Sequence, residues 1–68
     1  MYGEHIKNAR KEKGYTQTQV AKLTGIPQTT ISWIEKGKGL ANIHQCVLLA
    51  ECYEITLDEL IGRDNQNL

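Results

Sequence analysis

The stretch Gly25–Gly39, GIPQTTISWIEKGKG, begins like a turn, continues like a helix and ends at a helix stop. Pro27 has the fixed φ and the missing N–H donor that suit the entry to a helix. Gly37 is the residue type that commonly ends one. The stretch therefore predicts a short helix over about residues 28–36.

Most side chains of this predicted helix do not belong in a core. Ile31 and Ile34, three residues apart, are spaced to face inward. The positions expected to face mostly outward are Gln28, Thr29, Ser32 and Trp33. A short helix with a polar leading face and one aromatic residue is suited to contact another molecule.

A second short helix is predicted immediately before the turn. Thr16 followed by Gln19 fits a capping box, and Gly25 ends the segment about eight residues later. The side chains expected to face inward are Val20, Ala21 and Leu23.

Two longer helices flank this pair. Residues 3–13 are rich in helix formers and end at Gly14. Asn42 is suited to cap a helix over residues 43–53, which carries the widest apolar face of the chain and is expected to be the central core helix. The apolar residues assigned to that face are Ile43, Cys46, Val47, Leu49, Ala50 and Tyr53.

A fifth, short helix is predicted near the end of the chain. Thr56 and Glu59 form a further capping box, and Gly62 terminates the segment LDELI. Strand and hairpin signals are nearly absent, so the sequence predicts an all-α, compact five-helix domain over residues 1–62. Residues 63–68 offer no packing face and are expected to be a disordered tail.

Composition limits the classes of protein to consider. With 68 residues the chain can form one domain, and its formal net charge is zero. The charge is uneven, however: residues 1–38 carry seven basic and three acidic side chains, a net charge of +4, whereas residues 39–68 carry one basic and five acidic side chains, a net charge of −4. Such asymmetry is a hint of nucleic-acid contact by the basic half.

Other features point to a cytoplasmic protein that is not an enzyme. Cys46 and Cys52 are too few for a disulfide framework and are expected to be reduced. No signal peptide, membrane span, metal-ligand spacing or catalytic constellation is evident. His5 and His44 lack partners at ligand spacing, so neither a metal nor a cofactor is expected.

Two short helices joined by a tight, glycine-containing turn form the helix-turn-helix pattern of DNA-binding domains. The N-terminal residues of the second helix reach base edges in the major groove, and here they are Gln28, Thr29 and Thr30. Glutamine pairs with adenine through two hydrogen bonds, and threonine offers a hydroxyl and a methyl group. Ser32 belongs to the same set of predicted DNA contacts, and Trp33 is suited to lie against sugars or a thymine methyl group.

Contacts to the phosphate backbone are predicted on both sides of this helix. Thr16 and Gln17 open the preceding helix, where backbone amides favour a phosphate oxygen. Lys36 and Lys38 follow the second helix into the next loop and are suited to meet phosphates. A second group of lysines fits a solvated helix face: Lys7, Lys11 and Lys13.

Two stretches of the chain closely resemble the Cro/cI-type (XRE-like) helix-turn-helix family of lambda-like phage repressors and bacterial regulators. They are RKEKGYTQTQVAKLTGIPQTTISWIEKGKG, residues 10–39, and LLAECYEITLDELIG, residues 48–62. The resemblance covers about residues 3–62, and it is specific because several positions match together. These positions are Arg10, Thr16, Gln17, Ala21, Gly25, Ile31, Glu35 and Gly37.

The resemblance implies roles for four residues. Gln17 would support Gln28 beside an adenine while touching a phosphate, and Arg10 would form a structural ion pair with Glu35. Pro27 departs from the family, in which this position is often a Ser or Thr cap. Trp33 stands where relatives often have Arg, Lys or Gln.

The function expected from these observations is a sequence-specific regulator of transcription, most simply a repressor. It would bind double-stranded DNA as a homodimer on a two-fold-related site, without a cofactor. Relatives of this size often pair through the fifth helix and the segment before it. The corresponding apolar residues are Ile55, Leu57, Leu60 and Ile61.

Two alternative functions fit the same sequence. One is the antitoxin of a toxin–antitoxin pair, which also represses its own operon. The other is a protein-binding module that presents Trp33 to a partner without touching DNA. An antirepressor or a toxin would be a suitable protein partner.

Overall fold

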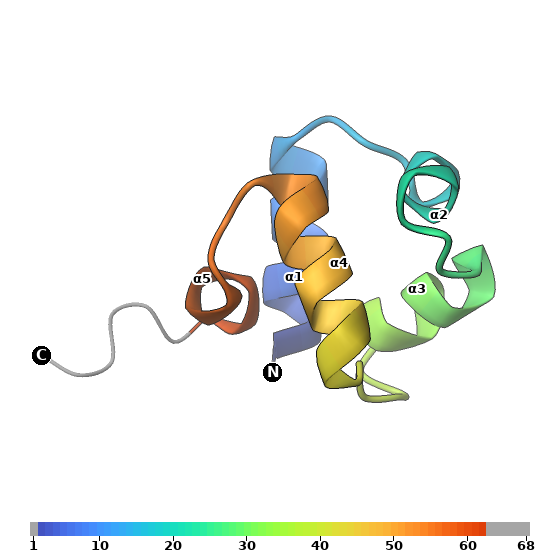
Figure 1. The fold of residues 1–68 in the computed structure, drawn as a ribbon. Helices are drawn as coiled ribbons and strands as arrows, with labels where there is room; N and C mark the ends of the chain where they lie inside the picture. The colour runs from blue at the N-terminus through green and yellow to red at the C-terminus, as the bar shows by residue number, and fades with distance from the viewer. Residues whose placement is uncertain (1, 63–68) are drawn as a thin grey trace, which may run out of the picture.

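The computed structural model describes residues 2–62, which form five helices and no strand (Figure 1). The helices are α1 (Tyr2–Glu12), α2 (Gln17–Thr24), α3 (Gln28–Glu35), α4 (Ile43–Tyr53) and α5 (Leu57–Ile61). The predicted all-α architecture is confirmed. The tail predicted at residues 63–68 lies outside the described residues. Within residues 2–62, no helix has the length and apolar character needed to cross a bilayer.

The helices pack in two groups around a central pair. In Figure 1, α1 and α4 occupy the middle of the molecule, α2 and α3 lie on one side of them, and α5 lies on the other. The packing contacts agree with this view, because α5 touches α1 and α4 whereas α2 touches α3 and α4. The helix-turn-helix unit and α5 are therefore at opposite sides of the domain.

The helix ends explain why the elements begin where they do. Thr16 and Gln19 form the predicted capping box, in which each side chain bonds to the other residue's backbone N–H at 2.8–3.1 Å. Thr56 and Glu59 repeat the arrangement at the start of α5. Asn42 caps α4, and Gln45 completes a capping box there that had not been predicted.

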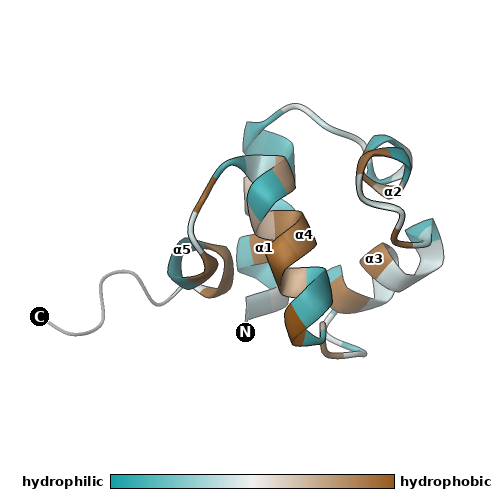
Figure 2. Ribbon diagram, viewed as in Figure 1, coloured by the Kyte–Doolittle hydropathy of each residue, from teal (hydrophilic) through white to brown (hydrophobic). Residues whose placement is uncertain are grey.

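The core lies where the helices converge. Every helix contributes at least one buried apolar side chain, and Figure 2 shows hydrophobic segments on α4 and on the side of α5 nearest α1. The buried apolar residues are Ile6, Val20, Ile26, Ile31, Ile34, Leu49, Ala50, Tyr53 and Leu60.

Three side chains that were predicted to face inward do not. Leu23 is 61% exposed because the buried side of α2 runs through Val20 and the half-buried Ala21 and Thr24, and Leu23 projects to one side of it. Ile43 and Val47 are also exposed. The buried face of α4 follows Leu49, Ala50 and Tyr53, and the first turn of α4 is solvent-exposed on the side of Ile43.

The backbones of α1 and α3, the second helix of the helix-turn-helix unit, approach each other closely at Gly3. Gly3 is buried, and a Cβ atom added to it would lie 2.5 Å from the backbone oxygen of Ile34. Because real Cβ contacts are not that short, a glycine is required for the two backbones to meet at this distance.

Candidate nucleic-acid interface

The turn between α2 and α3 determines how the two helices of the helix-turn-helix unit are joined. Gly25 adopts φ +80°, a left-handed conformation that ends α2 and reverses the chain. Ile26 is buried beneath the turn, and Pro27 precedes α3 without a side-chain cap. The backbone N–H groups at the start of α3 therefore receive no help from residue 27, in contrast to the capped starts of α2, α4 and α5.

An ion pair lies beneath this unit. Nε of Arg10 donates to Oε2 of Glu35 at 2.8 Å, and Nη2 of Arg10 donates to Oε1 at 3.1 Å. Nη1 of Arg10 also donates to the backbone oxygen of Tyr15 at 2.8 Å. Both Arg10 and Glu35 are buried, and the hydrogen bond to Glu35 raises the pKa of the Arg10 guanidinium although burial opposes it. The acidic residue on α3 is thus neutralised inside the protein.

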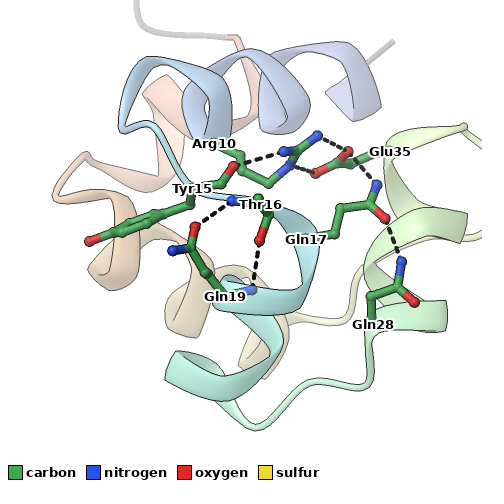
Figure 3. A network of polar contacts seen from close by, with 7 residues as sticks. All are labelled: Arg10, Tyr15, Thr16, Gln17, Gln19, Gln28 and Glu35. Carbon is green, nitrogen blue, oxygen red and sulfur yellow. Dashed lines mark hydrogen bonds and ion pairs between the residues drawn. The ribbon is translucent and has the colours of Figure 1, made fainter.

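Two glutamines extend this ion pair to the surface (Figure 3). Nε2 of Gln17 donates to Oε1 of Glu35 at 2.9 Å, and Nε2 of Gln28 donates to Oε1 of Gln17 at 2.7 Å. The four residues come from three helices and form one continuous chain of polar contacts from the core to the first residue of α3. We name Arg10, Glu35, Gln17 and Gln28 the polar relay.

The relay fixes the direction of each amide. An ionised carboxylate only accepts hydrogen bonds, so Gln17 must turn its Nε2 toward Glu35 and its Oε1 toward Gln28. Gln28 must then donate through Nε2, which leaves its Oε1 and one N–H free. One acceptor and one donor on the same amide are the groups that pair with adenine in the major groove.

The remaining residues assigned to DNA contact lie around the relay with different exposure. Thr29, Lys36 and Lys38 are exposed, and Trp33 is 57% exposed. Thr30 and Ser32 are half-buried, and they flank the outer face of α3. Thr16 is exposed at the start of α2, whereas Gln17 is half-buried by the relay.

The residues assigned to a dimer surface do not form one exposed patch. Leu57 is exposed, and Ile55 and Ile61 are half-buried. Leu60 is 0% exposed, so its assignment to the dimer surface is wrong. A helix as short as α5 needs one side chain to anchor it, and Leu60 is its only fully buried residue.

Two features of the structure had no signal in the sequence. Lys13 at the end of α1 pairs with Glu54, 41 residues away, and the contact lowers the pKa of the Glu54 carboxyl. The hydroxyl of Tyr53 is buried and has no hydrogen-bond partner among the described residues. Burial raises the pKa of that hydroxyl far above its ordinary value.

The cysteines and acidic residues form no metal-binding cluster in the described part of the chain. Cys46 and Cys52 are free, half-buried thiols, and burial raises the pKa of each. Across residues 2–62, His, Cys, Asp and Glu side chains do not gather in a group of three or more that could hold a metal ion.

Comparison with curated proteins identifies relatives with matching sequences. RstR, the cryptic phage CTXphi transcriptional repressor of Vibrio cholerae, is 39% identical over 69 residues, which cover 96% of this chain and 62% of RstR. The HTH-type transcriptional regulator AnsR of Bacillus subtilis is 30% identical over 93% of this chain and 54% of AnsR. The HTH-type transcriptional activator BcrR of Enterococcus faecalis is 32% identical over 90% of this chain and 30% of BcrR. The chain thus spans less than two thirds of the length of each of these relatives.

Solved structures share the fold of this chain, and a family profile gives its family. A SinR protein/SinI protein complex contains a chain that superimposes with a TM-score of 0.87 at 26% identity, covering all of this chain and 67% of that one. A transcriptional regulator from Listeria innocua shares the fold with a TM-score of 0.81 at 24% identity, over all of this chain and 64% of its own. The family profile described as helix-turn-helix matches residues 6–60. The chain therefore belongs to the helix-turn-helix family, of the Cro/cI type that its sequence resembles.

Proposed function

We propose that this protein is a sequence-specific, double-stranded DNA-binding regulator of transcription, most simply a repressor, that inserts α3 into the major groove. The observation that carries the proposal is the hydrogen bond from Gln28 to Gln17, 2.7 Å long, at the leading end of α3. It holds an amide ready for a base while the rest of the relay keeps the negative charge of Glu35 inside the protein. Gln28 would read an adenine, and Thr29 and Trp33 would contact neighbouring bases or sugars.

Phosphate contacts would hold α3 in register. The capping box of α2 uses the backbone N–H groups of Thr16 and Gln19 and leaves those of Gln17 and Thr18 at the open end of the helix. Such N–H groups and the helix dipole favour an anion. Lys36 and Lys38 are exposed after α3 and would meet the backbone from the other side.

A homodimer on a two-fold-related operator is part of the proposal. The surface that we assign to it comprises Ile55, Leu57 and Ile61, without the buried Leu60. Since α5 lies across the domain from α2 and α3, pairing there would leave both recognition helices free (Figure 1). The acidic side chains of α5, Asp58 and Glu59, would also stay away from DNA.

The names of the relatives support regulation of transcription, but they include both a repressor and an activator. RstR is named a repressor and BcrR an activator. We favour repression because steric exclusion of polymerase from an occupied operator needs no partner surface, and because RstR matches over nearly all of this chain. Reporter transcription from a promoter that overlaps the bound site would fall if the protein represses and rise if it activates.

The first experiment is a selection of binding sites from random duplex DNA. An enriched palindrome with half-sites about 10 bp apart, centre to centre, would support a dimer that reads DNA through α3. Sites enriched by the wild type but not by Gln28→Ala would tie the sequence preference to the relay. Failure of the wild type to enrich any site would contradict the proposed function.

A second candidate function, protein binding through the same fold, is supported by a different observation. Trp33 is 57% exposed and Leu40 is 82% exposed, and both line one shallow hollow at the side of α3. In Figure 2, hydrophobic segments also reach the first turn of α4 and the loop before it. The SinR chain was solved with a protein, SinI, so a domain of this fold is found beside a protein partner. An antirepressor or a toxin would be a partner of this kind.

Charge reversal separates the two candidates. Lys36→Glu with Lys38→Glu should abolish DNA binding and leave association with a protein partner intact, because the apolar hollow lies on the flank of α3. Leu40→Ala should have the reverse pattern if the hollow serves a protein, because Leu40 lines the hollow and is not assigned to DNA contact. Loss of both activities in both variants would indicate misfolding, which circular dichroism would reveal.

A further inference from the structure

The basic side chains in the first half of the protein are not equivalent. Arg10 is committed to Glu35, and Lys13 pairs with Glu54. The other lysines of this half form no ion pair within residues 2–62. They are Lys7, Lys11, Lys22, Lys36 and Lys38.

Three of these lysines line a single hollow. It is an open depression of about 680 Å³ between α1, the start of α2 and the end of α3. Its lining residues are Glu4, Lys7, Asn8, Lys11, Gln17, Glu35 and Lys36. Glu4, Lys7, Asn8 and Lys11 follow the spacing i, i+3, i+4 and i+7, so they form one stripe along α1.

The hollow is positively charged despite its two acidic residues. The carboxylate of Glu35 is already neutralised by Arg10 at 2.8 Å, so only Glu4 opposes three lysines. Lys7 and Lys11 stand four residues apart on the same helix face, an arrangement of like charges that is unfavourable on its own. An anion seated between them would remove this repulsion, and Asn8 and Gln17 add amide donors beside it.

The hollow is continuous with the surface proposed to meet DNA. Gln17 belongs to both, because its amide supports Gln28 and also lines the hollow. Lys36 closes the hollow directly after the last residue of α3. A DNA strand that passes the open end of α2 would therefore continue over the stripe on α1.

We propose that this hollow binds the phosphodiester backbone of duplex DNA, with Lys7 and Lys11 as contacts that extend the interface from the helix-turn-helix unit onto α1. The inference rests on the proposed function and enlarges its footprint. It also distinguishes Lys7 and Lys11 on α1 from Lys13, which follows α1 directly and pairs with Glu54. The contacts read no base, so they add affinity without changing which sequence is preferred.

The test is the salt dependence of DNA binding for Lys7→Gln/Lys11→Gln, with Lys22→Gln as the matched control. Lys22 is an exposed lysine in the same basic half that does not line the hollow. Removal of one phosphate contact should lower the slope of log K against log salt concentration by about 0.9. We expect a reduction of about 1 to 2 in the double variant, by the same relation, no change in the control, and an unaltered base preference in both. Lys7→Arg/Lys11→Arg should restore the wild-type slope.

Ethylation interference then locates the contact on the DNA. Ethylation of at least one phosphate should weaken DNA binding by the wild type and by Lys22→Gln, but not by Lys7→Gln/Lys11→Gln. A double variant with the wild-type slope and interference pattern would overturn the inference. Inorganic phosphate that shifts the amide signals of Lys7 and Lys11 without DNA, while the DNA slope stays unchanged, would assign the hollow to a free anion and would also overturn it.

Failure of the inference is distinguishable from failure of the proposed function. The slope is measured on the selected site and on random duplex DNA, because phosphate contacts act on both. If no site is selected, the proposed function fails, yet a lower slope of the double variant on random duplex still supports the hollow. If the wild type binds no duplex DNA at all, both proposals are wrong.

Discussion

The carboxylate of Glu35 accepts a hydrogen bond from the side chain of Gln17 at 2.9 Å, although the two residues lie on different helices. This contact decides which end of the Gln17 amide faces Gln28. A buried charge thereby sets the donor and acceptor pattern that the protein presents at its surface.

The amide of Gln28 should control preference at one base position. Gln28→Ala is expected to cost about 1–3 kcal/mol against the preferred base and much less against others, because it removes a two-bond contact. Lys38→Ala should weaken all sequences alike and lower the salt slope by about 1. Binding titrations on a set of single-base operator variants would check both, and equal losses on every sequence for both variants would contradict these roles.

Gln17 should act through Gln28. Gln17→Ala frees the Gln28 amide to rotate, so it should relax preference at the same base position as Gln28→Ala. The two changes should not be additive, with a coupling of about 0.5–3 kcal/mol as is common for residues in contact. A double-mutant cycle measured on the preferred operator and on its single-base variant would show this. Additive losses would mean that Gln17 contributes only a phosphate contact.

Breaking the ion pair on one side should destabilise the fold. Glu35→Gln leaves the buried Arg10 without its counter-charge, which typically costs about 3–5 kcal/mol. Replacement of both partners by apolar residues, Arg10→Met with Glu35→Leu, should recover much of the loss in the free energy of unfolding while abolishing sequence preference. Urea titrations followed by circular dichroism would measure the first effect. The exposed pair provides the control, since Lys13→Gln should change the midpoint little.

Removal of the Tyr53 hydroxyl should stabilise the protein. The side chain is 0% exposed and its hydroxyl has no partner among residues 2–62, so Tyr53→Phe is expected to gain about 1 kcal/mol. The half-buried Tyr15 offers a control, and Tyr15→Phe should be close to neutral. A lower midpoint in urea for Tyr53→Phe would show that the hydroxyl has a partner in solution.

The difference in unfolding free energy between Tyr53→Phe and the wild type should depend on pH. Burial raises the pKa of Tyr53 in the folded state above its unfolded value of about 10. The stability that this residue supports is present below that value and is lost as the pH rises above it, because only the unfolded chain then releases the proton. The advantage of Tyr53→Phe over the wild type should therefore widen above about pH 10. Unfolding free energies measured at pH 8 and above pH 10 would check the direction.

The sequence predicted the helices well because their ends carry local chemistry. Thr16, Asn42 and Thr56 cap their helices through residues three positions away, and Gly25 ends a helix by its own conformation. Such signals need no knowledge of the rest of the fold.

Burial was less predictable, because it depends on neighbours that a local pattern does not contain. Leu60 is one of four apolar residues between Ile55 and Ile61, and only the packing of α5 on α1 and α4 decides that it is the anchor. Lys13 and Glu54 meet 41 residues apart in sequence, at the ends of two different helices. The role assigned to Arg10 and Glu35 came from resemblance to a family and not from spacing, since they are 25 residues apart.

The polar relay also bears on how this protein could acquire a new operator. Gln28 is bound to Gln17 and through it to the buried charge, so a change at residue 28 also leaves the amide oxygen of Gln17 without its partner. Thr29 and Trp33 make no side-chain hydrogen bond within residues 2–62 and are exposed. Selection acting on a population of variants would therefore find new base preferences most readily at residues 29 and 33, while residue 28 stays constant.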